Sequence, residues 1–418
     1  MAQFARQKGL KLLTTGDWTH PLWLREIRNV LKEENEGIFT LSDGEEKTHF
    51  MLSVEVSSIY SQGGKVRRIH CLIFSPSFET CEKINNELLR RGANLTSDGR
   101  PIVGIPAKNL LELVLSVDKE AFIIPCHVWT PWFSLYGSMS GFDSIDECFG
   151  EYSKEIFAIE TGLSSDPSMN WRIKELDDRS IVSFSDAHSP MKMGREATAF
   201  DLVKLSYKEI KNALKRSGKS KISYTIEFYP EEGKYHYDGH RNCKVVQSPK
   251  ETKENGNICP VCKRPLTVGV MYRVEELSGR EEKFEDKPNA GGLVWAVDPS
   301  RNHPPFVKLV PLNEIIAEAI KSPVTSPKVK RIFEDLVSEF DSEMEILLKK
   351  DINELKVKAG EEIASAIQKV RKGDIYIQPG YDGEYGIVKI SSDASEGTME
   401  DKEPKSLSSS QNQLGLDF

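Results

Sequence analysis

Residues 121–131 of this 418-residue chain read AFIIPCHVWTP. An apolar run of this kind, ended by proline and polar residues, is typical of a buried strand, and here a histidine stands where the strand ends. Five further stretches repeat the pattern: LKLLTTGD (10–17), HFMLSVEVSSIY (49–60), RRIHCLIFSP (67–76), IFAIETG (156–162) and SIVSFSDAHSP (180–190). Helical patterns separate them, as in residues 81–92 and 107–117. This alternation predicts an α/β fold with parallel strands and helical crossovers.

Beyond this first domain, the sequence predicts three further regions. We expect the α/β domain to span residues 1–205, followed by a basic segment and a cysteine-rich module in residues 206–305. Residues 306–390 have a helical pattern, and one buried helix face is predicted from Val329, Ile332, Leu336, Phe340, Met344 and Leu347. Residues 391–418 are polar and rich in Ser, Asp, Glu and Lys, so we expect a disordered tail.

The composition excludes several classes of protein. The sequence has no run of about 18 apolar residues, so it predicts no membrane span, and the N-terminus lacks the apolar core of a secretory signal. We therefore expect a cytoplasmic protein. With 56 basic and 64 acidic residues, the net charge of −8 disfavours a protein that coats nucleic acid along its whole surface, but it allows a local basic groove and association with the nucleoid. Residues 213–220 approach a phosphate-binding loop but lack its first glycine, so we do not expect ATP binding.

Histidines and carboxylates recur at or near the ends of the predicted strands. The candidate catalytic residues are Asp17, His20, Glu55, His70, His127, Asp186 and His188. Active sites of parallel barrels are assembled at the strand ends. Histidine and carboxylate together suit divalent metals, and two metals about 3.5–4 Å apart are a standard arrangement for phosphoester hydrolysis. One such residue alone would most simply be a core residue with its hydrogen bonds satisfied. Their recurrence at five strand ends favours a catalytic cluster of Mg, Mn or Zn ions.

The cysteines predict a second, structural metal site. An odd number, seven, without an export signal argues against a disulfide framework. His240 and Cys243 are separated by two residues, and so are Cys259 and Cys262, with fifteen residues between the pairs. Four such ligands suit one tetrahedral structural zinc. His236 is the competing histidine ligand, and a set of free thiols is the alternative to zinc binding.

The motifs resemble a known family. The segments TGDWTHP (15–21), SVEVSSIY (53–60), RRIH (67–70), PCHVWTPWFS (125–134), ETGLSSDP (160–167) and SFSDAHSP (183–190) resemble the PHP-type metallophosphoesterase domain and, more narrowly, the endonuclease Q family of DNA-repair nucleases. The similarity continues through the cysteine module and PGYDGEYG (379–386). It implies a distorted (β/α)7 barrel with up to three metals, a small zinc-binding module and a C-terminal helical region. It also implies nicking 5′ to uracil, hypoxanthine, xanthine or an abasic site.

The resemblance also implies roles for individual residues. His70 and His127 would share a metal with Glu55, Asp186 would bind a second metal, and His188 a third. Asp17 and His20 fall where the family has an Asp-His pair, but their spacing here is three residues rather than one, so either of them could be the ligand. Glu160 is expected to order the site through hydrogen bonds.

One family feature is missing from the sequence. The family pattern opens with an H-x-H on a first strand, and this chain begins at Met1 without it. We therefore expect that the start is truncated or misassigned, so that a first strand is missing; the alternative is a real loss of two ligands of one metal. If the chain as written is the whole product, one metal should bind weakly and nuclease activity should be reduced.

Three segments are candidates for contacts with macromolecules. Residues 204–221 hold seven basic residues and one acidic residue, so they predict a phosphate-binding face, which Lys328, Lys330 and Arg331 could extend; a solvated lysine-rich helix is the alternative. Residues 131–143 could form the pocket for a flipped base, or Trp132 and Phe133 could belong to the core. At the C-terminus, Gln413, Leu414, Leu416 and Phe418 match a bacterial sliding-clamp-binding peptide; the eukaryotic and archaeal pattern through Gln411 fits less well.

These observations predict a metal-dependent endonuclease that repairs DNA containing deaminated bases. The first alternative is a PHP-type phosphatase that acts on a small phosphomonoester, although such a substrate needs neither a zinc module nor a clamp peptide. The second alternative is a catalytically impaired, clamp-associated DNA-binding protein. The sequence leaves open the preferred base, the native metals and the oligomeric state.

Overall fold

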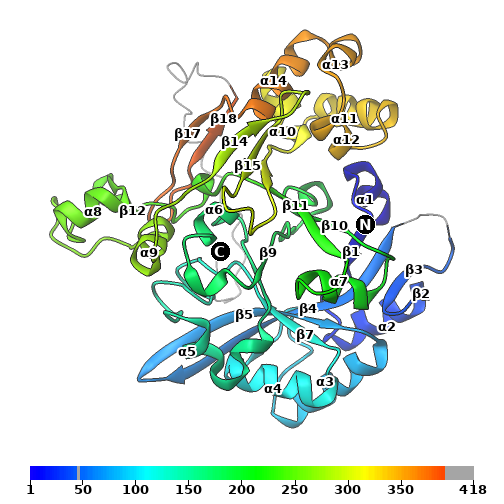
Figure 1. Ribbon diagram of the computed structural model, residues 1–418, viewed down its shortest axis with the longest axis vertical. Helices are drawn as coiled ribbons and strands as arrows, with labels where there is room; N and C mark the ends of the chain where they lie inside the picture. Colours follow the sequence, from blue (N-terminus) through cyan, green and yellow to red (C-terminus); the bar gives the residue numbers. More distant parts are fainter. Residues whose placement is uncertain (45–47, 391–418) are drawn as a thin grey trace, which may run out of the picture.

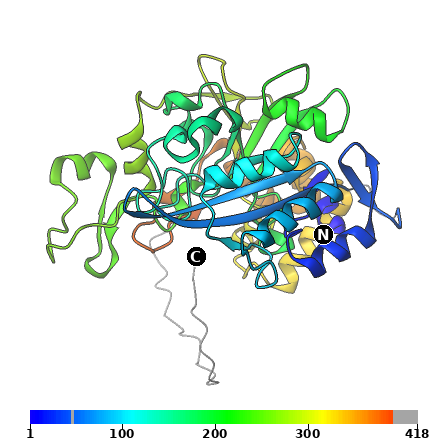
Figure 2. The same ribbon diagram turned by 90° about the horizontal axis from the view of Figure 1, so that it is seen from below.

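The computed structural model describes residues 1–44 and 48–390 of the chain. It is a mixed α/β structure, shown in Figure 1 and, from below, in Figure 2. The predicted clamp-binding peptide lies outside the described residues. None of the helices in the described part is long and apolar enough to cross a membrane.

A seven-stranded sheet forms the centre of the N-terminal half. Its strand order is β2-β3-β4-β5-β7, and β1 and β6 both pair with β4. The strands are β1 (Leu12–Thr14), β2 (Leu31–Asn35), β3 (Ile38–Leu41), β4 (His49–Gln62), β5 (Lys65–Ser75), β6 (Ile102–Val103) and β7 (Phe122–Pro125). The helices of this half are α1 (Ala2–Lys8), α2 (Pro21–Val30), α3 (Phe78–Arg90), α4 (Ala107–Val117), α5 (Ile145–Phe149), α6 (Pro167–Asn170) and α7 (Tyr207–Leu214). Helices α3 and α4 lie along β5, as both views show.

The longest strand pair of this sheet is antiparallel. Strand β5 pairs with β4 along the whole length of β5, from Lys65 opposite Gln62 to Ser75 opposite Leu52. Gly63 and Gly64 connect them with φ angles of 62° and 73°, as a two-residue hairpin turn requires. Strand β7 is also antiparallel to β5. The prediction of parallel strands joined by helical crossovers is therefore wrong for these pairs: the Gly-Gly turn reverses the chain between β4 and β5, and the longer connection through α3 and α4 leads to an antiparallel β7.

Parallel pairing does occur elsewhere. Strand β1 is parallel to β4, and β8 (Ala158–Glu160) is parallel to β9 (Ser180–Val182). Both predicted strands of the second pair are therefore in the expected places. None of the sheets formed by residues 1–44 and 48–390 closes into a barrel. The structure thus supports the mixed α/β class.

The C-terminal half contains a second, five-stranded sheet and a group of helices. The sheet order is β10-β11-β16-β15-β14, with bounds Ala197–Asp201, Lys221–Glu227, Phe306–Lys308, Val294–Val297 and Glu285–Pro288. Two hairpins flank it, β12 (Asp238–His240) with β13 (Val245–Gln247), and β17 (Tyr376–Gln378) with β18 (Ile387–Lys389). The helices are α8 (Pro249–Asn255), α9 (Val270–Leu277), α10 (Leu312–Ala319), α11 (Pro327–Glu339), α12 (Glu343–Leu348), α13 (Ile352–Ala359) and α14 (Glu361–Lys372). Five short 3-10 helices complete the described fold: η1 (Gly150–Glu155), η2 (Lys174–Leu176), η3 (Pro190–Lys192), η4 (Pro230–Glu232) and η5 (Arg241–Cys243).

The predicted long amphipathic helix is two helices. Helix α11 ends at Glu339, Asp341 adopts a φ of 73°, and the Ser342 side chain accepts the N–H of Glu345 to cap α12. The predicted apolar face is nevertheless largely buried, because Val329, Leu336, Phe340 and Leu347 all belong to one core cluster. The apolar spacing therefore identified the core residues, while the serine cap decided where the helix breaks.

The N-terminal helix is packed against the C-terminal helices. Figure 1 shows α1 beside α11 and α12. The Lys8 ammonium lies 2.6 Å from the Glu343 carboxylate, and both side chains are almost fully buried. Lys8 also lies over the ring of Phe333, with 5.3 Å from its nitrogen to the centroid. The start of the first predicted domain is therefore joined to the helical region.

Candidate functional site

Three of the predicted ligands meet between neighbouring strands. Glu55 lies on β4, His70 on the adjacent β5, and His127 just beyond the end of β7. The distances are 2.7 Å from Glu55 Oε1 to His70 Nδ1, 3.6 Å from Glu55 Oε1 to His127 Nε2, and 3.1 Å between the two imidazole nitrogens. The structure thus brings together the three residues that the family resemblance assigns to one metal.

The protonation states of two of these residues, Glu55 and His70, suit a divalent cation. Burial raises the pKa of Glu55, but hydrogen bonds from His127 and His70 outweigh it and hold the pKa well below its ordinary range. Burial lowers the pKa of His70 to about 4. An ionised carboxylate and a neutral imidazole are the forms that bind metal, because a ligand must first lose its proton. The ligand atoms of Glu55, His127 and Cys126, the residue before His127, lie within 4.8 Å of one another.

Asp17 stands beside this trio, with His20 next to it. Burial raises the pKa of Asp17, and the negative charges of Asp98 and Glu55 raise it further, which places all three carboxylates within electrostatic reach. His20 stands at the N-cap of α2, where its backbone N–H donates to the Asp17 carbonyl over 2.9 Å. Asp17 therefore lies within electrostatic reach of the cluster, and His20 belongs to the same turn as Asp17.

The last two predicted ligands are more exposed. The side chains of Asp186 and His188 are 49% and 84% exposed, and Asp186 Oδ1 lies 3.7 Å from His188 Nε2. Burial lowers the pKa of His127, but the hydrogen bond and the charge of Glu55 outweigh it and raise the pKa, with smaller contributions from Glu160 and Asp186, so Asp186 lies within electrostatic reach of the cluster. No contact between His188 and Glu55, His70 or His127 occurs among the described residues. The structure therefore does not bring His188 into the group.

Three of the eleven non-glycine residues with positive φ in the described part of the chain are candidate ligands. Asp17, His127 and Asp186 have φ angles of 52°, 34° and 42°, in the left-handed region that non-glycine residues seldom adopt. Such conformations cost about 1–3 kcal/mol each and cluster at active sites, where the surrounding structure holds them. The conformation of His127 depends on the absence of a side chain at Gly162, because a Cβ atom there would lie 2.5 Å from the Cβ atom of His127. The left-handed conformation fixes the direction in which each of these three side chains leaves the backbone.

Two neighbouring residues complete the site. The buried Glu160 carboxylate accepts the backbone N–H of His127, and burial raises the pKa of Glu160 to about 7. This contact agrees with the ordering role that the sequence suggested. Arg100, which the sequence reasoning missed, lies with its Nη1 atom 3.4 Å from Glu55 Oε1. The turn sequence Ser-Asp-Gly-Arg at 97–100 was the available signal for it.

Some side chains of the loop of residues 131–143 belong to the buried core, and others lie near the candidate site. Its Tyr136 stacks on Trp129 in the buried core, with ring centroids 4.7 Å apart. Its Phe133 ring lies 4.9 Å from the His70 ring, directly against a candidate ligand. Its Trp132 is half-buried and meets the Tyr235 ring edge-on at 5.4 Å. Of its two predicted aromatics, Trp132 is thus the one that remains partly accessible near the cluster.

A helix of the cysteine module fixes this loop. The buried Arg273 side chain of α9 donates to the carbonyls of Tyr136, over 2.9 Å, and Phe142, over 3.2 Å. These hydrogen bonds cross about 130 residues of sequence, because they connect the loop after His127 to a helix after Cys262. Hydrogen bonds therefore join the cysteine module to the loop that follows His127.

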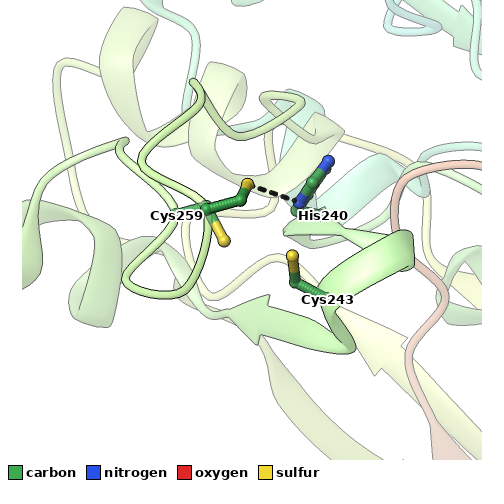
Figure 3. A group of neighbouring side chains, drawn as sticks. His240, Cys243 and Cys259 are labelled. Atoms are coloured by element: carbon green, nitrogen blue, oxygen red, sulfur yellow. Dashed lines mark hydrogen bonds between the residues drawn. The ribbon is translucent and has the colours of Figure 1, made fainter.

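The four predicted zinc ligands form a second group. The ligand atoms of His240, Cys243, Cys259 and Cys262 all lie within 4.8 Å of one another, and Figure 3 shows the three labelled side chains pointing toward a shared centre. His240 Nδ1 lies 3.3 Å from Cys262 Sγ. His236, the competing ligand, is buried elsewhere and stacks on Tyr237. The geometry favours His240 as the histidine of the set.

Local backbone geometry explains why these side chains converge. Burial raises the pKa of Cys259, but the backbone amides of Cys262 and Val261 donate to its thiolate and lower the pKa to about 6. Lys244 and Lys263 each follow a cysteine with φ angles of 54° and 61°, which turns the chain back around the centre. Four convergent ligands with amide-stabilised sulfur are the donor set of a closed structural zinc site.

Part of the basic segment is engaged in internal contacts, although only Lys211 of its seven basic residues is buried. The buried Lys211 ammonium bonds to the carbonyls of Lys119 and Glu120 and to the Glu120 carboxylate. Arg216 donates to the carbonyls of Asp177 and Asn302. These basic side chains stabilise the fold, so the segment does not present all seven of its charges as one phosphate-binding face.

Comparisons of sequence identify related proteins. A family model described as the MJ0043 C-terminal domain matches residues 311–374. The uncharacterized protein MJ0043 of Methanocaldococcus jannaschii is 34% identical over 269 residues, which are 63% of this chain and 31% of that protein. The chain thus spans about a third of that relative's length. The uncharacterized protein YqxK of Bacillus subtilis is 26% identical over 93% of this chain and 91% of its own length.

Comparisons of structure cover nearly the whole chain. The lesion-specific endonuclease PfuEndoQ from Pyrococcus furiosus matches with a TM-score of 0.78 and 28% identity, over 95% of this chain and 91% of that protein. An endonuclease Q crystallised with a 27-mer duplex carrying an abasic lesion at its active site matches with the same TM-score and 29% identity, over 96% of this chain and 93% of that one. The resemblance to endonuclease Q that the sequence motifs indicate is therefore confirmed.

Proposed function

Because the chain is a structural relative of endonuclease Q over about 95% of its length, we propose that it is a metal-dependent DNA-repair endonuclease. Its substrate would be DNA with a deaminated base or an abasic site, nicked on the 5′ side of the lesion. The observation that carries the proposal is the Glu55–His70–His127 cluster, which joins metal-binding chemistry to the fold of a lesion-specific nuclease.

The side chains around the cluster fit divalent metal ions. Bound there, such ions would activate water and stabilise the negative charge that develops on the phosphate. Glu55, His70 and His127 would hold one ion, with Asp17 and Asp186 as further carboxylate ligands. Glu160 fixes the backbone of His127, and Gly162 gives that residue the room its φ angle requires. We expect zinc to be structural at the module of His240, Cys243, Cys259 and Cys262.

Other parts of the chain support the role of DNA as the partner. The half-buried Trp132 and Tyr235 offer ring faces near the cluster on which an exposed base could stack. We further propose that Gln413, Leu414, Leu416 and Phe418 dock on a sliding clamp, and that the protein acts in the cytoplasm. The domain boundaries at 205, 305 and 390 remain part of the same proposal.

Cleavage of labelled DNA tests the proposal. Duplexes with one uracil, hypoxanthine or abasic site, and an undamaged duplex, are incubated with the chain and Mg²⁺ or Mn²⁺. We expect one nick at the 5′ side of each lesion, and a loss of at least about a hundredfold on His70→Ala or His127→Ala. His49→Ala is the matched control, because His49 pairs with Glu34 away from the cluster.

Two outcomes would favour the alternatives. Hydrolysis of p-nitrophenyl phosphate without any nicking would favour a phosphatase of small phosphomonoesters. Lesion-specific binding without cleavage in either metal would favour a catalytically impaired DNA-binding protein. The exposed position of His188, away from the other candidate ligands, is consistent with such an impairment.

A further inference from the structure

The loop between α3 and β6 carries a basic side chain into the candidate metal cluster. We propose that Arg100, on this loop, binds the phosphate of the DNA strand at the position of cleavage. This inference rests on the proposed nuclease function and assigns the substrate's phosphate a protein ligand besides the metals. Arg100 belongs to the turn Ser97-Asp98-Gly99-Arg100.

The turn is held against the cluster by contacts that only a glycine allows. A Cβ atom on Gly99 would lie 2.4 Å from the carboxylate carbon of Asp17, so the Gly99 backbone lies directly against the Asp17 side chain. The Thr19 hydroxyl donates to the Gly99 carbonyl over 3.3 Å, and the Arg100 N–H donates to the Asp98 carboxylate over 3.4 Å. The start of the Arg100 side chain is therefore fixed with respect to the ligands.

Arg100 is the most accessible member of the group it joins. Its Nη1 atom lies 3.4 Å from Glu55 Oε1, and its side chain is 29% exposed, compared with 21% for Glu55, 17% for His127 and 2% for His70. Exposure thus increases from His70 at the bottom of the cluster to Arg100 at its rim. A DNA phosphate that approaches the cluster from solvent would meet the guanidinium group early.

The negative charges around the cluster explain why a cation at this position would help a DNA phosphate to bind. Asp17, Glu55 and Asp98 interact as like charges, and whatever part of this negative charge bound metal ions leave unneutralised repels a phosphodiester. A guanidinium group offsets part of that repulsion and presents planar N–H pairs that match two phosphate oxygens. Arg195, another nearby cation, donates instead to the carbonyls of Ser185 and Asp186, so it braces the Asp186 turn.

The alternative role for Arg100 is to position Glu55, and the two roles predict different measurements. Binding of a lesion duplex is measured in Ca²⁺ at several salt concentrations for the wild type, Arg100→Gln and Arg100→Lys. Affinity for Mn²⁺ alone, and kcat and KM for nicking, are measured on the same proteins. Arg28→Gln is the matched control, since Arg28 pairs with Glu82 on the surface.

If Arg100 binds phosphate, Arg100→Gln lowers the slope of log affinity against log salt by about one. It also lowers kcat by about 10²–10³, while the Mn²⁺ affinity stays within twofold of the wild type. Arg100→Lys retains the salt slope, since the charge remains, but recovers only part of kcat because lysine lacks the planar fork.

An unchanged salt slope together with a weakened Mn²⁺ affinity would overturn the inference and assign Arg100 to the positioning of Glu55. The proposed function fails separately, if the wild type nicks no lesion. In that case the salt slope of DNA binding still decides the role of Arg100, because that measurement needs no turnover.

Discussion

Replacement of Lys8 by methionine should destabilise the protein far more than its place in a short N-terminal helix suggests. The Lys8 and Glu343 side chains are 1% and 2% exposed, and their charged atoms lie 2.6 Å apart. Glu343 also accepts the backbone N–H of Leu312 over 3.0 Å, so its carboxylate is anchored at the start of α10. Methionine keeps the volume of the lysine stem and removes only the charge.

The magnitude follows from the burial of the pair. Removal of one partner leaves a carboxylate buried without its counter-charge, which costs about 3–5 kcal/mol for buried ion pairs. Replacement of both partners, in Lys8→Met with Glu343→Gln, should recover most of that loss, because no unpaired charge then remains and the glutamine oxygen can still accept the Leu312 N–H. Lys330→Met is the matched control, since the Lys330–Glu334 pair is exposed and should contribute less than about 1 kcal/mol.

Urea unfolding, followed by circular dichroism and by tryptophan fluorescence, measures these differences. Both probes are needed because a chain of this size need not unfold in one step. A loss below about 1 kcal/mol for Lys8→Met, or a double variant no more stable than the single one, would refute the assignment of Lys8–Glu343 as a buried pair that joins α1 to the C-terminal helices.

Three further predictions concern the cluster, the zinc module and a buried turn. Gly162→Ala should lower nicking by about 10²-fold, because its Cβ atom would displace His127, whereas Gly104→Ala, which meets no atom within 4 Å, should leave the rate unchanged. Cys259→Ser should release one equivalent of zinc per chain, detected by elemental analysis, and make the module sensitive to protease; retention of zinc would contradict the assigned ligand set. Burial raises the pKa of Asp298, but hydrogen bonds from Ser300 and His303 outweigh it and lower the pKa to about 2 from 3.8. The stabilisation is therefore complete above about pH 4 and lost as the pH falls toward 2, so Asp298→Asn should flatten the decline of the urea midpoint in that range; an unaltered decline would show that other carboxyls cause it.

Local sequence patterns predicted much of the fold. The apolar runs at 121–131, 156–162 and 180–190 each contain a strand, and the helical patterns at 81–92 and 107–117 coincide closely with α3 and α4. These predictions succeed because burial of alternating or continuous apolar side chains is a local property of the chain. Strand direction was predicted wrongly for β4 and β5, since direction depends on the connection and the Gly63-Gly64 turn reverses the chain.

The sequence by itself determined which chemical groups the protein carries: carboxylates and histidines at strand ends, and four soft ligands in two spaced pairs. Only the tertiary structure decided which of them meet. Glu55, His70 and His127 converge because β4, β5 and β7 are neighbours in one sheet, while His188 stays exposed on a turn. Arg100 joins the cluster through the close approach of Gly99 to Asp17, a contact across 82 residues of sequence that no spacing rule contains. Metal ligation and charge depend on distances of a few ångströms, and such distances are set by packing between segments that are remote in the chain.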